Sequence, residues 1–304
     1  MKRLIKRALL ACLCLALVIV TVLGGLLLVD PKIYTDYIKQ HAIRAARDQN
    51  ILISWGKSGM TPLNFTAYDF QASLPRLLLQ LSASRLSLSQ RPSSWLRLSP
   101  EIIIQADLYG GRAESRLQLG GPLGAMPRSI TAAGVQPGKH PYVASFLGIT
   151  SGSIELSAPE IRGQSVEDLT FIGDIALHNI SKPQATTLTP ALSGLPLALT
   201  IPAITSLSGS AHVDLSAEKL SISGLNLTSS LGDVLGRAVY QRTANGHLST
   251  LNAEFKIDLS EEGLKSAGPF LPLVSQNQLN DRSRSFTIAL HGEPKRPQVR
   301  FWAR

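Results

Sequence analysis

Cysteine is scarce in this sequence. The chain has two, Cys12 and Cys14, and both lie in an apolar run near the N-terminus. The rest of the chain therefore has no thiol for a disulfide, a metal site or a catalytic nucleophile. Charged residues are also few, at 17% of the chain against roughly 25% in a typical globular protein. This deficit predicts a large surface covered by apolar, Ser or Thr side chains.

Motifs for catalysis and ligand binding are missing as well. The sequence contains no Gly-x-Ser-x-Gly elbow, and no two of its histidines stand at helical metal-binding spacing. After the N-terminus no compact Lys/Arg stripe is interleaved with aromatic residues, which argues against nucleic acid as a partner. We therefore expect no enzyme activity, no cofactor and no metal site. The six histidines are His41, His140, His178, His212, His247 and His291.

What the sequence does contain is one long apolar run, from Ala8 to Val29, without a charged, Asn, Gln or Pro side chain. At about 1.5 Å per residue, a helix of this length spans the roughly 30 Å hydrocarbon layer of a bilayer. The run is longer than the apolar region of a cleaved signal peptide. We predict a single transmembrane helix with the N-terminus in the cytoplasm, because four basic residues and no acidic residue precede it: Lys2, Arg3, Lys6 and Arg7.

The segment 34–48 has apolar residues at three- and four-residue steps, which predicts a short amphipathic helix with a basic side. This helix could lie near anionic lipid headgroups or plug the end of a sheet, and the second use is favoured. From Ile51 onward the period changes to two, as in strands with one solvated face.

The clearest strand pair runs from Ile102 to Leu119, where Gly110 and Gly111 separate two alternating runs. Two glycines predict a tight hairpin turn, because both central residues can take positive φ. Pairing the residues on either side of this turn places Asp107 opposite Glu114, two like charges that oppose the register. The same register predicts an apolar face, the core or groove of the domain, that includes Ile102, Ile104, Leu108, Leu117 and Leu119.

The rest of the chain continues the β-rich pattern. Residues 121–150 are rich in Gly and Pro and are predicted to be a linker or long loop between two halves, 30–120 and 151–304. Near the C-terminus a strand at 248–259, an interrupted helix at 260–274 and a strand at 285–290 are expected, the last pairing with Val299 and Phe301. The predicted fold is mainly β: a cytoplasmic segment 1–7, the membrane helix 8–29, and an antiparallel curved sheet or sandwich with short helices.

Several of these segments resemble the general secretion pathway protein N family, in the longer form found with type II secretion systems. The similarity lies in the membrane helix followed by the helix 34–48, in the hairpin at 106–111, in the segment 195–202, and in the segment 291–301, which resembles the family's terminal Gly-x-x-x-x-Pro strand. It extends more broadly to AsmA-like proteins. Asn50 stands where the family commonly has a glycine that ends the first helix, and Asn can replace glycine in a left-handed cap.

The resemblance implies an inner-membrane protein with most of its chain in the periplasm, acting as an accessory or scaffold of a type II secretion system. Its expected partners are the membrane and other secretion-system envelope proteins. The alternative is AsmA-like lipid binding or transfer, in which the apolar face forms an open groove for acyl chains. A closed sandwich core would explain the same face without any ligand, and an envelope hydrolase would require Ser, His and Asp side chains clustered in space.

Overall fold

The computed structural model describes residues 31–48, 50–61, 63–74, 79–91, 100–119, 125–163, 170–188, 191–192, 195–196, 199–216, 218–242, 249–293 and 297–303. The predicted membrane helix 8–29 and its basic flank Lys2, Arg3, Lys6 and Arg7 lie outside these residues. Across the described ranges, no helix is both long enough and apolar enough to cross a bilayer.

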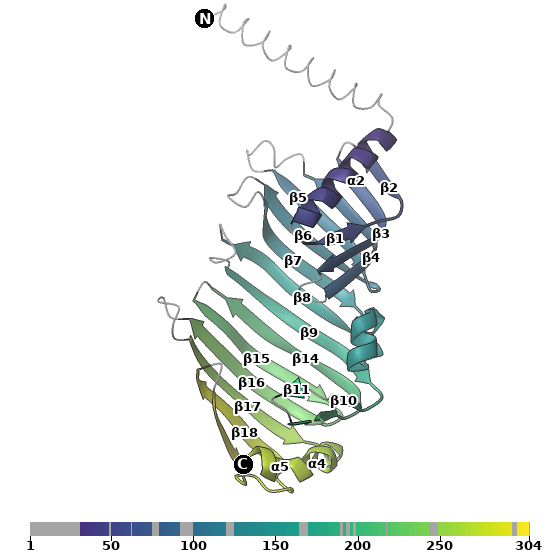
Figure 1. The fold of residues 1–304 in the computed structure, drawn as a ribbon. Coiled ribbons are helices and arrows are strands. Elements are labelled where there is room, and N and C mark those ends of the chain that lie inside the picture. Colours follow the sequence, from purple (N-terminus) through teal and green to yellow (C-terminus); the bar gives the residue numbers. More distant parts are fainter. Residues whose placement is uncertain are drawn as a thin grey trace, which may run out of the picture.

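The chain is mainly β and forms one long antiparallel sheet of 15 strands within the described residues. The strands follow one another across the sheet in chain order, except that β2 also pairs with β3 and that β9 pairs with β14. Figure 1 shows them side by side in a single layer from α2 at one end to α4 and α5 at the other. Two further sheets, β10–β13 and β11–β12, have two strands each.

The first half of the sheet contains β1 (Leu52–Ser54), β2 (Ser58–Thr61), β3 (Asn64–Leu74), β4 (Leu79–Gln90), β5 (Glu101–Leu108), β6 (Gly111–Leu119), β7 (Ala125–Val135), β8 (Ser151–Arg162) and β9 (Thr170–Lys182). The second half contains β14 (Ile204–Leu215), β15 (Lys219–Ser229), β16 (Gly232–Arg242), β17 (Ser249–Leu259), β18 (Ser285–Gly292) and β19 (Gln298–Ala303). The small sheets use β10 (Thr186–Leu188), β11 (Ala191–Leu192), β12 (Leu195–Pro196) and β13 (Leu199–Ile201).

Helices are short and lie at the ends and one margin of the sheet (Figure 1). They are α2 (Pro31–Asp48), the one-turn helices at Pro137–Lys139 and Val143–Leu147, α4 (Glu261–Ala267), the 3₁₀ turn Gly268–Phe270 and α5 (Leu271–Val274). Helix α2 contains the predicted segment 34–48. Beyond its end, Asn50 has φ 58° and donates its N–H to the carbonyl of Arg47 at 2.8 Å, the left-handed geometry expected for a helix cap.

The hairpin β5–β6 has a different register from the predicted one. Its turn residues are Tyr109 and Gly110, with φ 49° and 84°, and Gly111 begins β6. Each strand residue therefore faces a partner two positions earlier than predicted, and Asp107 faces Arg112. Because the difference is two residues, every side chain stays on its predicted face.

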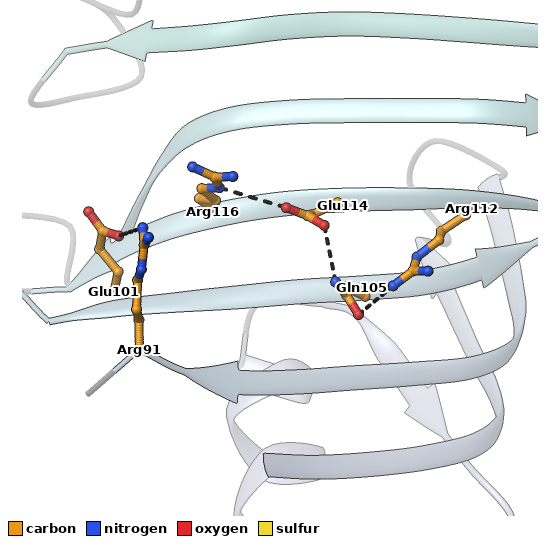
Figure 2. Close-up of polar contacts among 6 residues, drawn as sticks. All are labelled: Arg91, Glu101, Gln105, Arg112, Glu114 and Arg116. Atoms are coloured by element: carbon orange, nitrogen blue, oxygen red, sulfur yellow. Dashed lines mark hydrogen bonds and ion pairs between the residues drawn. The ribbon is translucent and has the colours of Figure 1, made fainter. Parts of the chain in front are cut away.

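Charge explains why the observed register is better. The predicted pairing opposed Asp107 and Glu114, whereas in the structure Glu114 accepts a hydrogen bond from Gln105 at 3.0 Å. Arg112 in turn donates to the Gln105 side chain at 2.7 Å, and Arg116 lies 3.7 Å from Glu114. Figure 2 shows this chain of contacts running along the two strands. Like charges no longer face each other, and each carboxylate has a compatible neighbour.

The predicted linker at 121–150 is also corrected. Strand β7 lies within it and pairs with both β6 and β8, so the sheet continues through this segment. Pro127 is tolerated in the strand because it stands opposite Leu117 where the register shifts, and a bulge has no ladder N–H to lose at the proline. The remainder, residues 136–150, forms the two one-turn helices and their connections.

Candidate functional site

One face of the sheet is apolar along its whole length. A row of directly paired residues crosses the first half, and every member is Ala, Leu or Ile: Ala67, Leu86, Ala106, Ala113, Ala132, Leu156, Ile175 and Ala211. A second row continues from β14 to β19 with Val213, Ile222, Ala238, Ala253, Leu290 and Val299. We call the surface that contains these two rows the apolar face.

The opposite surface, the polar face, has the reverse composition. Its matching row from β3 to β15 contains no apolar residue and reads Thr66, Ser87, Gln105, Glu114, Thr131, Ser157, Asp174, His212 and Ser223. Successive side chains of a strand point to opposite faces, so the alternating sequence separates the two surfaces completely along these rows. One face is thus suited to water and the other to an apolar environment.

The five residues predicted for the apolar face are brought together on it. Ile102 lies directly opposite Leu117, while Ile104 and Leu108 alternate with it along β5, and Leu119 follows Leu117 by two positions on β6. All five are half-buried. Neighbouring side chains of the same face cover part of each one, and the remainder is open to solvent.

In the described part of the chain the main sheet has no partner sheet of comparable size, since the two other sheets have two strands each. Each strand of the main sheet contacts its neighbours in the sheet, and the helices contact it at β1, β2, β8 and β17. Large side chains of the central strands stay partly accessible, and Ile175 is 36% exposed. The arrangement differs from a sandwich, in which a second sheet about 10 Å away would bury these residues.

The N-terminal end of the apolar face is closed by aromatic packing beneath α2. Trp55 is 7% exposed and stacks on Phe70 with ring centroids 6.4 Å apart, while Phe65 meets its edge at 6.0 Å. Lys39 of α2 donates to the Trp55 carbonyl at 3.1 Å and lies 5.5 Å from the ring centroid. The helix is therefore fixed to this end of the sheet, as an end plug would be.

The C-terminal end is closed by α4 and α5. We call these helices, together with the turn that follows them to Arg284, the cap. Leu271, Leu279 and Phe286 are buried in one cluster, against which Ile257 and Phe301 of the apolar face pack. The Ser260 side chain, just before α4, accepts a hydrogen bond from the Gly263 N–H at 3.0 Å and so stabilises the first turn of this helix. The apolar face is thus closed at both ends and partly accessible between them.

The polar face carries two histidine–carboxylate pairs. His212 lies 2.8 Å from Asp174, and His178 lies 3.5 Å from Glu155. The side chains are between 44% and 70% exposed, so water screens both pairs. A hollow of about 390 Å³ beside them is lined by Arg112, Glu114, Thr131, Glu155, Ser157 and Asp174, among others.

Register also places Ser223 opposite His212, which puts Asp, His and Ser in one row. Catalysis by such a row needs a water-excluded pocket and free backbone donors for an oxyanion. These residues instead stand on an exposed surface, where water reaches the side chains of His212 and Asp174. Across the described ranges, no group of three or more His, Cys, Asp or Glu side chains could hold a metal ion.

The sequence did not reveal the pair of His212 and Asp174, because the two residues are 38 positions apart. Only the pairing order of β9 and β14 brings them together.

No protein family, curated protein or solved structure matches the chain.

Proposed function

We propose that this chain is a bacterial inner-membrane protein, anchored by residues 8–29, whose periplasmic sheet binds the acyl chains of lipids on its apolar face. The observation that carries the proposal is the pair of apolar rows, whose side chains are partly exposed between the two closed ends of the sheet. At about 4.8 Å per strand, the main sheet is roughly 60 Å long. It could therefore hold acyl chains, which span about half of a 30 Å hydrocarbon layer.

An apolar face that is partly open to solvent calls for an occupant. Soluble proteins rarely leave contiguous apolar patches larger than a few hundred Å² open to water. A protein partner would be expected to form about one hydrogen bond per 100–200 Å² of interface. Side chains of the apolar rows offer no donor or acceptor, and their backbone groups are paired within the sheet. Acyl chains need no hydrogen bonds and fit this surface better.

The experiment uses two adjacent isoleucines of β5 as a matched pair. Ile104 is on the apolar face, and Ile103 is on the polar face opposite Arg116. The full chain is purified from native membranes with a photoreactive phenylalanine derivative at position 104 or at position 103. After illumination, intact-protein mass spectrometry should find lipid adducts for position 104 and at least about tenfold fewer for position 103. Equal labelling of the two positions, or no lipid adduct at 104, would contradict the proposal.

The second candidate is an accessory or scaffold of a type II secretion system, which rests on the resemblance of the sequence segments. The observation that favours a protein partner is the terminal strand β19, where Val299 and Trp302 are 44% and 43% exposed. An exposed edge strand can pair with a strand of another protein. Co-purification of the detergent-solubilised chain with secretion components would support this role. Normal secretion after deletion of the gene, with no partner recovered, would argue against it.

A further inference from the structure

The end of the sheet farthest from α2 exposes three large apolar side chains in one short segment. Phe270, Leu273 and Val274 are 60%, 79% and 63% exposed, whereas Leu271 between them is 8% exposed. We call residues Gly268 to Val274, the 3₁₀ turn and α5, the distal tip. The polar face has single exposed apolar residues, such as Ile172 and Leu235, but the distal tip gathers three within five positions.

The distal tip is held rigidly. Leu271 is buried against Phe286 and Leu279, and the Ser275 N–H donates to the Leu271 carbonyl at 3.0 Å. Prolines at 269 and 272 restrict the backbone further. The outward apolar side chains are therefore presented in a fixed arrangement and do not fold back onto the sheet.

Size and chemistry indicate what binds there. With side chains of roughly 150–200 Å² each, the three exposed fractions amount to about 350 Å², well below the roughly 800 Å² per partner of a stable protein interface. Protruding Phe, Leu and Val side chains do suit insertion among lipid headgroups and the first acyl carbons. Around the tip, exposed Lys265, Asp281 and Arg282 carry both signs of charge, so attraction to anionic lipid contributes little.

We propose that the distal tip is a membrane-contact site that inserts Phe270, Leu273 and Val274 into the interface of a lipid bilayer. The distal tip lies at the opposite end of the sheet from α2 (Figure 1), roughly 60 Å away by strand spacing. We infer that it contacts a second bilayer surface, a point that rests on the membrane anchor of the proposed function. The inference does not depend on whether acyl chains occupy the apolar face, since the two surfaces are tested with different probes.

The test places an environment-sensitive dye beside the tip in the full chain. Cys12 and Cys14 are replaced by Ser, and the dye is attached to Ser266→Cys, which is exposed on α4; a dye on Ser223→Cys of the polar face is the control. Protein in nanodiscs is mixed with vesicles of phosphatidylethanolamine and phosphatidylglycerol that contain a quencher-labelled lipid. The dye at 266 should be quenched and the dye at 223 should not, with little change at high salt.

Substitution variants then identify the side chains responsible. The triple variant F270S/L273S/V274S should lower the apparent vesicle affinity at least about tenfold, while I172S/L235S, which removes two exposed apolar residues of the polar face, should leave it unchanged. Circular dichroism checks that both variants are folded. If the dye at 266 is not quenched in the wild type, or if it is still quenched in the triple variant, the proposal is overturned. Lipid adducts at position 104 should be the same in wild type and triple variant.

Discussion

Replacing Phe286 with Ala should release the cap from the sheet. Phe286 is 4% exposed and packs with Leu271 and Leu279 of the cap, so its side chain joins the cap to the apolar face. Truncation of a buried Phe costs about 3–5 kcal/mol, because apolar contact is lost and a cavity remains. Since Leu271 and Leu279 lose their main partner, most of this cost should fall on the attachment of the cap.

Hydrogen exchange followed by mass spectrometry measures this directly. A loss of about 3–5 kcal/mol should speed exchange of protected amides in residues 261–284 by roughly 10²-fold to nearly 10⁴-fold. Strands β5 to β9 should keep their protection, because β14, β15 and β16 lie between them and the strands that the cap packs against. Leu290→Ala is the matched control: it lies on the same strand and face but pairs with Ala253 and Val299, away from the cap.

Local attachment of the cap through Phe286 is refuted if Phe286→Ala leaves exchange of residues 261–284 unchanged, or if Leu290→Ala accelerates that exchange to the same extent. In the first case the cap would be held by contacts other than this cluster. In the second, the sheet and the cap would unfold together, and local attachment would not describe the molecule.

Two further substitutions test the hairpin. Gly110→Ala should lower the free energy of unfolding by about 1–2 kcal/mol, because Gly110 has a φ of 84°. Gly111→Ala should lower it further, because a Cβ there would overlap the backbone of β7. Urea unfolding should rank the two variants in this order, and the reverse order would contradict the assignment of the turn. Tyr109→Phe removes the hydroxyl that accepts from Ser82 N–H at 2.9 Å and donates to the Gln80 carbonyl at 3.1 Å, and should cost about 1–3 kcal/mol. Burial raises the pKa of Tyr109 above its ordinary value, so this tyrosine loses its proton at a lower pH in the unfolded chain than in the folded one. The wild type should therefore lose stability as pH rises above about 10. If Tyr109→Phe loses stability with pH in the same way, another group is responsible.

The strand pattern near the C-terminus could be predicted from the sequence because alternation there is uninterrupted. Leu251, Ala253 and Phe255 all lie on the apolar face, and the predicted pairing of the next strand with Val299 and Phe301 is confirmed. In these segments the local pattern and the tertiary environment favour the same arrangement.

The hairpin turn could not be predicted correctly because the deciding contacts are distant in sequence. Local rules favour glycine at both central positions. In the structure Tyr109 takes one of them, with φ 49°, while its hydroxyl is bound by Ser82 and Gln80 of β4. Gly111 is required for a different reason, the close approach of β7. A non-local contact therefore decided which residues form the turn.

The sequence also could not predict whether the apolar face is a buried core or an open surface. Ile102 and Leu117 would alternate in the same way in either case, because the pattern reports which side is apolar and carries no information on what covers it. The answer depended on the order of the strands. The described residues pair almost every strand with its predecessor, which makes one long layer, and they form no second sheet of similar size to close it.

That order also has a consequence for assembly. Because nearly every strand docks on the strand made just before it, ordering can advance in one direction as the polypeptide emerges, each new segment finding its template already in place. The stability of such a sheet resembles that of a linear repeat protein, in which the total free energy of folding is a sum of contributions from neighbouring units. A chain that stops early would keep its completed strands and expose one fresh edge, whereas damage in the centre would divide the molecule into two separately folding parts.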